Sequence, residues 1–255
     1  MPVTLIYDGT FEGLLTAIFE IYEYRYTDIE IAAAENHFLE NIFADNHQVC
    51  TNRDKAERVL IKLEKNLGKS GCNDLLKLFF SEHPQMEALF FHAVKSSLQN
   101  PSLNIFQNFA DDQILEISKV LKSMRREIHR MHAFIRFERL EDDLYFAKIE
   151  PDFNMLPLIF RHFKARYRDQ RWMIVDLKRN FGVTYDLADI HFINPEPEQL
   201  QQFLNSGQFH HQDERQFQKM WQTYFVKTGI PSRKNMKLHI QHVPKRYWKY
   251  LTEKA

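Results

Sequence analysis

The chain has 255 residues, of which 44% are hydrophobic and 27% charged, and its 34 basic residues balance 34 acidic ones. This composition is typical of a globular protein with enough chain for one large core or two small ones. Seven glycines leave few positions for phosphate-binding loops, which disfavours a P-loop or dinucleotide-binding enzyme. Taken alone, the net charge of zero argues against a nucleic-acid-binding protein.

No run of the sequence reaches the roughly 18–20 apolar residues that a membrane-spanning helix needs. The N-terminal residues lack a basic segment and reach Asp8 too early for a signal peptide. The two cysteines, Cys50 and Cys72, form no CxxC pair, so we expect reduced thiols. The expected compartment is therefore the cytoplasm.

The first hundred residues predict a mainly helical lobe with a small β element. A β-rich run at 3–7 and a turn at 8–10 precede apolar residues at helical spacing from 11 to 22. A second strand is predicted at 29–34, and helices at 52–67, 73–80 and 84–98. Because the pattern breaks at 99–102, we expect residues 1–108 to form an N-terminal lobe of their own.

The remaining residues, 109–255, predict a second lobe that begins with a long helix. Apolar residues at 114, 117, 121, 124, 128 and 131 fall on one helical face. A β-hairpin is predicted at 133–149, a helix at 152–167, and paired strands at 172–177 and 183–187. Short helices are expected within 194–218, before a closing segment at 234–251. The predicted fold class is α+β, with an antiparallel sheet and flanking helices in this lobe.

The neutral total hides a strongly uneven distribution of charge. Residues 1–50 contain nine acidic residues and one basic residue, a net charge of −8. Residues 226–255 contain eight basic residues and one acidic residue, a net charge of +7, and residues 161–182 carry +5. Such asymmetry indicates contact with a polyanion at one end, with a partner at the other, or between the lobes.

Basic and aromatic residues alternate at 166–172 and 245–250. Cations can neutralise phosphates while aromatic rings stack on exposed bases. The alternative is that helices bury the rings and solvate the charges. Trp172, Tyr247 and Trp248 are the stacking candidates. The candidate nucleic-acid-binding residues are Arg125, Arg126, Arg166, Arg168, Arg171, Trp172, Lys178, Arg179, Arg233, Lys234, Lys237, Lys245, Arg246, Tyr247, Trp248 and Lys249.

A few carboxylates and one histidine are the candidate catalytic residues. Carboxylates on paired strands could bind Mg²⁺ for phosphodiester chemistry, although a salt bridge from Asp176 or Asp186 to Arg179 or Arg171 is the simpler explanation. The candidates are Asp169, Asp176, Asp186 and His162.

Two His-x-x-His pairs could each place two ligands on one helical face. They are His129 with His132, and His239 with His242. No pattern supplies a third ligand, so ordinary hydrogen bonding is favoured. We therefore expect neither a metal ion nor a cofactor.

Several segments resemble an uncharacterised bacterial family. They are 130–137, 145–152, 169–176 and 243–251, together with the opening 7–13. Members of that family are labelled probable DNA metabolism proteins and are built on a domain of unknown function. The likeness extends over nearly the whole chain.

The resemblance implies a role in bacterial DNA repair beside a radical-SAM protein and a uracil-DNA-glycosylase-like protein. The chain has too few cysteines for a radical-SAM cluster. It ends shortly after the basic segment, so we expect glycosylase-like activity to come from a partner. The resemblance supplies no catalytic residues.

Together these observations predict a DNA-binding accessory protein in DNA repair or metabolism. One alternative is a metal-dependent enzyme acting on DNA or nucleotides. The other is a protein-interaction adaptor that does not contact DNA.

Overall fold

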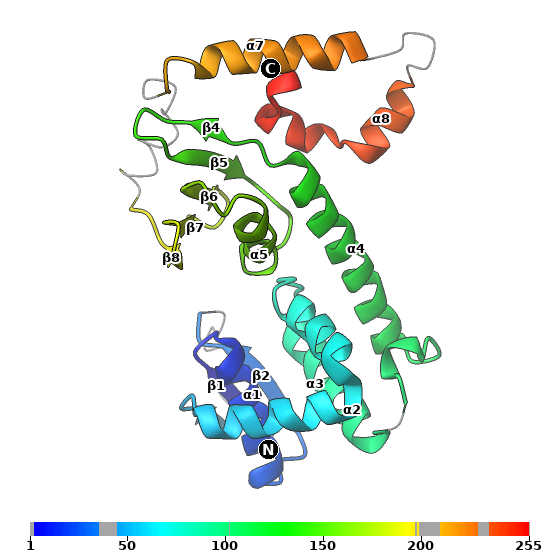
Figure 1. Ribbon diagram of the computed structural model, residues 1–255. Coiled ribbons are helices and arrows are strands. Elements are labelled where there is room, and N and C mark those ends of the chain that lie inside the picture. Colours follow the sequence, from blue (N-terminus) through cyan, green and yellow to red (C-terminus); the bar gives the residue numbers. More distant parts are fainter. Residues whose placement is uncertain are drawn as a thin grey trace. The chain divides into compact units, whose positions relative to one another are not determined.

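A computed structural model describes residues 3–35, 45–101, 103–196, 198, 210–228 and 235–254 of the chain (Figure 1). The chain divides into two compact units, Met1–Met124 and Arg125–Ala255. The division falls inside helix α4 (Asp112–Phe134), later than the expected boundary at 108. The α+β class is confirmed, with a mainly helical first part and a sheet in the second. Among the described helices, none combines the length and apolarity needed to cross a membrane.

The first unit contains a three-stranded parallel sheet. Its central strand β1 (Val3–Tyr7) pairs with β2 (Ile29–Ala33) and β3 (Asp45–Gln48). Helix α1 (Phe11–Glu23) follows β1, and the Thr10 hydroxyl caps it by accepting the Gly13 amide hydrogen at 2.9 Å. These elements confirm the predicted strands and helix. The sequence did not predict β3, because all four of its residues are polar.

Two helices complete the first unit. Helix α2 (Arg53–Phe79) is capped by Asn52 and joins the two helices predicted at 52–67 and 73–80. It kinks at Gly68, whose φ of +67° lies in the left-handed region that glycine adopts readily. Helix α3 (Met86–Gln99) follows, then the short η1 (Ile105–Gln107). Leu14, Leu63 and Phe90 are among the fully buried side chains of this core.

Helix α4 carries the predicted apolar stripe, of which every member is buried except the half-buried Ile128. The stripe continues one turn further through Met131 and Ile135, and the Ile135 amide donates to the Met131 carbonyl. The helix therefore runs to Phe134 and shortens the strand predicted at 133–140 to β4 (Glu138–Arg139). Glu127 is also buried, although it is charged.

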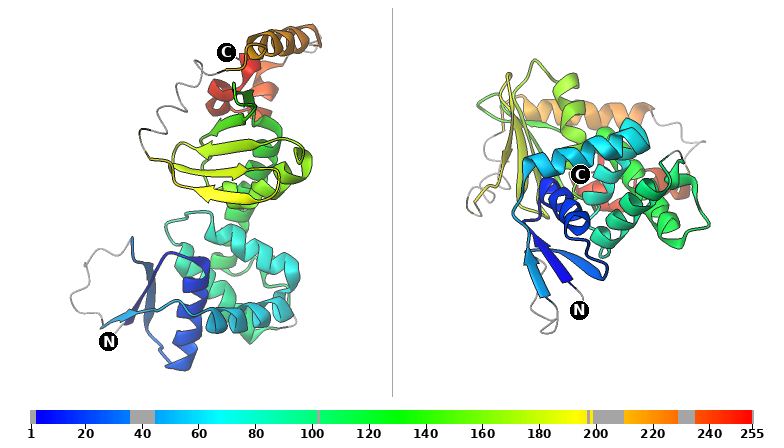
Figure 2. Two further views of the ribbon diagram at one scale, coloured as in Figure 1. Left: turned by 60° about the vertical axis from the view of Figure 1, so that its left-hand side comes forward. Right: turned by 90° about the horizontal axis from the view of Figure 1, so that it is seen from below.

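The second unit contains a five-stranded sheet in the order β4-β5-β6-β7-β8 (Figure 2). The pairs of β4 with β5 (Tyr145–Ile149) and of β6 (Trp172–Asp176) with β7 (Phe181–Tyr185) are antiparallel, as predicted. Strands β5 and β6 are parallel, because the chain crosses between them through α5 (Leu156–Arg166). The sheet is therefore mixed rather than antiparallel. An additional strand, β8 (Ile190–Ile193), was not predicted.

Helix α5 packs on the sheet through aromatic contacts. The Trp172 ring is completely buried and lies 6.3 Å from Phe163 and 6.4 Å from Phe137, centroid to centroid. Helix α7 (Glu214–Thr228), helix α8 (Met236–His242), and the short η4 (Lys245–Tyr250) and η5 (Thr252–Lys254) end the described chain. The short helices predicted at 194–218 fall mostly outside the described residues.

Two histidines stack where α4 meets α5. The rings of His132 and His162 lie 3.9 Å apart and are inclined by only 15°. Burial, together with His162 and His129, lowers the pKa of His132 to about 4. Burial and the nearby Arg166 also lower the pKa of His162. Both imidazoles are therefore held in the neutral form at neutral pH.

We expect acid to destabilise the second unit through His132. A base whose folded-state pKa is depressed contributes its full stability above the unfolded-state pKa and loses it as the pH falls toward the folded-state value. Between pH 7.5 and 5 this loss is at most about 2 kcal/mol. Urea unfolding at both pH values, compared between the wild type and His132→Gln, measures it. Equal acid sensitivity of the two proteins would contradict the assignment.

Candidate functional site

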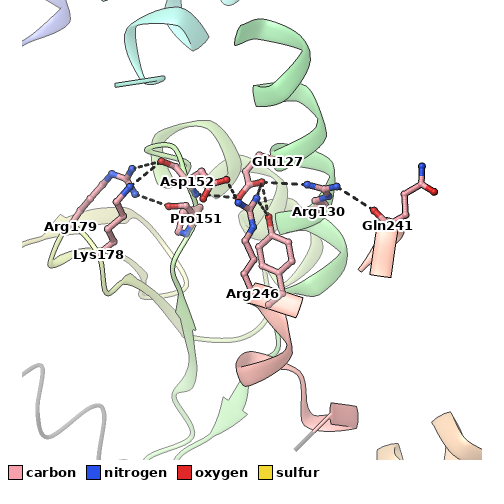
Figure 3. Close-up of polar contacts among 9 residues, drawn as sticks. Glu127, Arg130, Pro151, Asp152, Lys178, Arg179, Gln241 and Arg246 are labelled. Atoms are coloured by element: carbon pink, nitrogen blue, oxygen red, sulfur yellow. Dashed lines mark hydrogen bonds and ion pairs between the residues drawn. The ribbon is translucent and has the colours of Figure 1, made fainter. Parts of the chain in front are cut away.

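Arg246, in the basic C-terminal segment, is paired inside the second unit (Figure 3). The Arg246 guanidinium donates to Glu127 Oε2 at 2.5 Å and also contacts Asp152. The Tyr247 hydroxyl donates to the same Glu127 oxygen at 2.6 Å. Burial and the Glu127 carboxylate raise the pKa of Tyr247 to about 12. These contacts attach η4 to α4, so Arg246 is an anchoring residue.

The basic pair that follows β6 is also engaged. Arg179 forms an ion pair with Asp176 at 2.7 Å and donates to the carbonyls of Pro151 and Asp152. Lys178 donates to the Asp152 carbonyl from an exposed position. The simpler interpretation of Asp176, a salt bridge to Arg179, is thus confirmed. Burial nevertheless raises the pKa of Asp176.

The predicted stacking residues differ in exposure. Trp172 and Tyr247 are buried, with 0% and 4% of their surfaces exposed, so neither presents its ring to a base, contrary to the prediction. Trp248 is half-buried, its indole N–H donates to the Val243 carbonyl, and its ring lies near the ammonium groups of Lys245 and Lys254. Lys249 pairs with Glu150.

Another set of cations faces solvent without a carboxylate partner among the described residues. Arg166 ends α5 and contacts the Tyr167 hydroxyl and ring, while Arg171 donates to the Asp142 carbonyl. Arg168 lies between them and is exposed. We call Arg166, Arg168 and Arg171 the arginine turn. Lys237 and Lys245 are also exposed.

Four further candidate cations are either already engaged or lie outside the described residues. Arg125 and Arg126 are exposed and already hold an interaction. Arg233 and Lys234 lie outside the described residues.

A cavity of about 630 Å³ opens beside the arginine turn. Its size falls in the range of ligand-binding clefts. The aromatic residues that line it are Phe137, Tyr145, Tyr167, Trp172, Phe217 and Trp221, and the basic ones are Arg136, Arg139 and Arg166. We call this cavity the aromatic groove.

Helix α7 forms one wall of the aromatic groove. Phe217 and Trp221 are one helical turn apart and therefore share a face. They remain 55% and 40% exposed. The Trp221 indole N–H donates to Glu253 at 2.9 Å, and the same carboxylate pairs with Arg136 at 2.8 Å. Trp221 is thus held in place while part of its surface stays open.

The polar lining of the groove is mainly cationic. Glu214 is its only acidic member among the described residues, and the Glu214 carboxylate accepts the Arg139 amide hydrogen and the Gln218 amide. Arg139 pairs with Asp143 at 2.5 Å. The buried indole N–H of Trp172 has no acceptor among the described residues. The groove therefore combines ring surfaces, guanidinium groups and a free donor.

Only part of this groove was predicted from the sequence. Arg166 and Trp172 were among the candidate residues, whereas Arg136, Arg139, Phe217 and Trp221 were not. The spacing of Phe217 and Trp221 was an available signal, but the same spacing is typical of a core-facing stripe. Their exposure depends on which face of α7 the rest of the unit covers.

The weak catalytic candidates do not form one site. Asp176 lies opposite Phe181 at one end of the β6–β7 pair, whereas Asp186 follows Tyr185 at the other end, five residues from Phe181 and therefore about 16 Å away at 3.3 Å per residue. Asp169 precedes β6 and is exposed. Hydrogen bonds from the amides of Asp189 and Ala188 lower the pKa of Asp186, which also contacts His191. These carboxylates therefore do not converge on one metal ion.

The described histidines likewise form no metal site. His162 stacks on His132, and His239 lies beside the Trp248 ring. Among the described residues, no three potential His, Cys, Asp or Glu ligands come together. Cys50 and Cys72 are both free thiols.

Comparison with known proteins gives one family match. The sequence model of a family described as a domain of unknown function, DUF4130, matches residues 84–253. No curated protein matches the chain. Among solved structures, a DHH domain from a protein described as a member of a family of ribosomal proteins is similar at 13% identity and a TM-score of 0.23. That match covers 72% of this chain and 56% of the other, and at this TM-score it supports no inference.

We expect Glu127→Ala to destabilise the second unit by about 1–3 kcal/mol, because it removes the acceptor of the buried Tyr247 hydroxyl and one partner of the 36% exposed Arg246. Glu150→Ala removes the partner of the more exposed Lys249 and should cost at most about 1 kcal/mol. Urea unfolding followed by tryptophan fluorescence measures both, since all three tryptophans lie in the second unit. Equal losses would show that Glu127 is not an anchor.

Proposed function

Because the chain belongs to the DUF4130 family, a domain of unknown function, we infer its role from its own surface and propose that it is a DNA-binding accessory protein. The arginine turn is the observation that carries this proposal. Three guanidinium groups within six residues, none with a carboxylate partner among the described residues, suit contact with successive phosphates. Guanidinium groups also match phosphate oxygens in bidentate geometry.

The other candidate cations of the second unit differ in their availability to a ligand. Lys237 and Lys245 are further exposed cations in the second unit, whereas Arg179, Arg246 and Lys249 already hold carboxylates. The net charge of +5 over residues 161–182 is thus partly engaged in internal pairs and partly open to a ligand. The arginine turn carries the charges of this segment that are open to a ligand.

The family resemblance extends the proposal to the biological setting. It suggests a bacterial protein that acts in DNA repair or metabolism, beside a radical-SAM protein and a uracil-DNA-glycosylase-like protein. The two unpaired cysteines suggest the cytoplasm as its compartment. The separation of Asp176 from Asp186 gives no support to the alternative of a metal-dependent nuclease. The adaptor alternative predicts that the arginine turn does not bind DNA.

Arg168→Ala combined with Arg171→Ala should weaken binding to duplex and single-stranded DNA alike. Each lost phosphate contact lowers the slope of log affinity against log salt by about 1, so the double variant should lose about 2. Fluorescence anisotropy with labelled DNA between about 50 and 200 mM salt measures both quantities.

The matched control is Lys65→Ala with Lys69→Ala, which removes the same charge from α2 in the first unit. It should bind DNA as the wild type does. If the wild type binds no DNA but still captures a partner protein from nuclease-treated lysate, the adaptor function is correct and this proposal fails.

A further inference from the structure

The aromatic groove shares residues with the arginine turn. Arg166 belongs to both, and Tyr167 and Gln170, which lie within the same segment, line the groove. A DNA strand whose phosphates contact the arginine turn therefore passes the opening of the groove. We infer, building on the proposed function, that the aromatic groove receives an unpaired base of that strand.

The shape and chemistry of the groove fit a base. Phe217 and Trp221 offer ring surfaces that are half exposed, and any base can stack on such a surface. The side chains of Gln170 and Gln218 also line the cavity, and Gln amides can pair with base edges.

Charge distinguishes this occupant from an apolar peptide or helix. Three arginines line the groove, of which Arg136 and Arg139 pair with carboxylates, and Glu214, its single acid among the described residues, already accepts two hydrogen bonds. Arg166 forms no ion pair with a carboxylate among the described residues, so it is available to a phosphate. A base attached to its phosphate satisfies both the rings and the cations.

A base inside a duplex cannot enter such a groove without leaving the stack. The protein should therefore prefer single-stranded DNA, or a duplex with one unpaired nucleotide, over a fully paired duplex of the same sequence. The arginine turn contacts the backbone in all three cases. A comparison of the three DNA forms therefore separates phosphate binding from base binding.

Fluorescence anisotropy with those three DNA forms tests the inference. Phe217→Ala should weaken binding to the unpaired forms by about fivefold or more, since one stacked base contributes about 1–3 kcal/mol, and leave the paired duplex unaffected. Met220→Ala is the matched control, because Met220 lies on the same helix at 59% exposure and does not line the groove.

Tryptophan emission gives a second readout. A base that stacks on Trp221 quenches part of the emission, and Trp221→Phe should remove that part. A free mononucleotide that quenches equally at the same concentration would assign the groove to nucleotides and overturn the DNA inference.

The remaining outcomes separate the two proposals. Equal affinity for paired and unpaired DNA, or equal behaviour of the Phe217 and Met220 variants, would overturn the base site and leave salt-dependent DNA binding in place. Absence of binding to any DNA form would overturn both.

Discussion

A buried carboxylate on α4 is the constraint on which the second unit depends. Glu127 lies beside an apolar stripe, and an ionised carboxylate is stable there only with donors around it. Arg246 and Tyr247 supply those donors and thereby fix η4. The adjoining η5 then holds α7, because Glu253 accepts the Trp221 indole N–H and the Thr252 carbonyl accepts the Gln222 amide. The ion pair between Glu127 of α4 and Arg246 of η4 thus helps to position α7, which forms one wall of the aromatic groove.

The electrostatics of the chain are clearer from side-chain partners than from sequence totals. The last thirty residues carry a net charge of +7, yet Arg246 and Lys249 are bound to carboxylates of the same unit. The short segment after α5 carries fewer charges, but its guanidinium groups lack carboxylate partners among the described residues. The surface that can bind a polyanion is therefore the one whose cations lack carboxylate partners, and not the one with the most cations.

Periodicity predicted most of the regular elements, because apolar residues at helical or alternating spacing must face a core. It predicted the α4 stripe and the β6–β7 pair, and the class followed from them. It did not predict β3, whose residues are polar, or the parallel pairing of β5 with β6, which depends on the path of the crossover. The burial of Trp172 and Tyr247 could not be predicted either, since an aromatic ring beside a basic residue suits both a core and a surface. The groove depends on which residues of α7 stay uncovered, and tertiary packing decides that.

The Glu127–Arg246 contact also joins residues that are 119 positions apart in the chain. Because η4 supplies the donors of a buried carboxylate, the C-terminal segment belongs to the fold of the second unit and is no removable appendage. Proteolytic trimming before η4 would leave a buried carboxylate without its donors while also removing positive charge. Loss of DNA binding by a shortened chain would then report unfolding, and only point substitutions at exposed cations would report recognition.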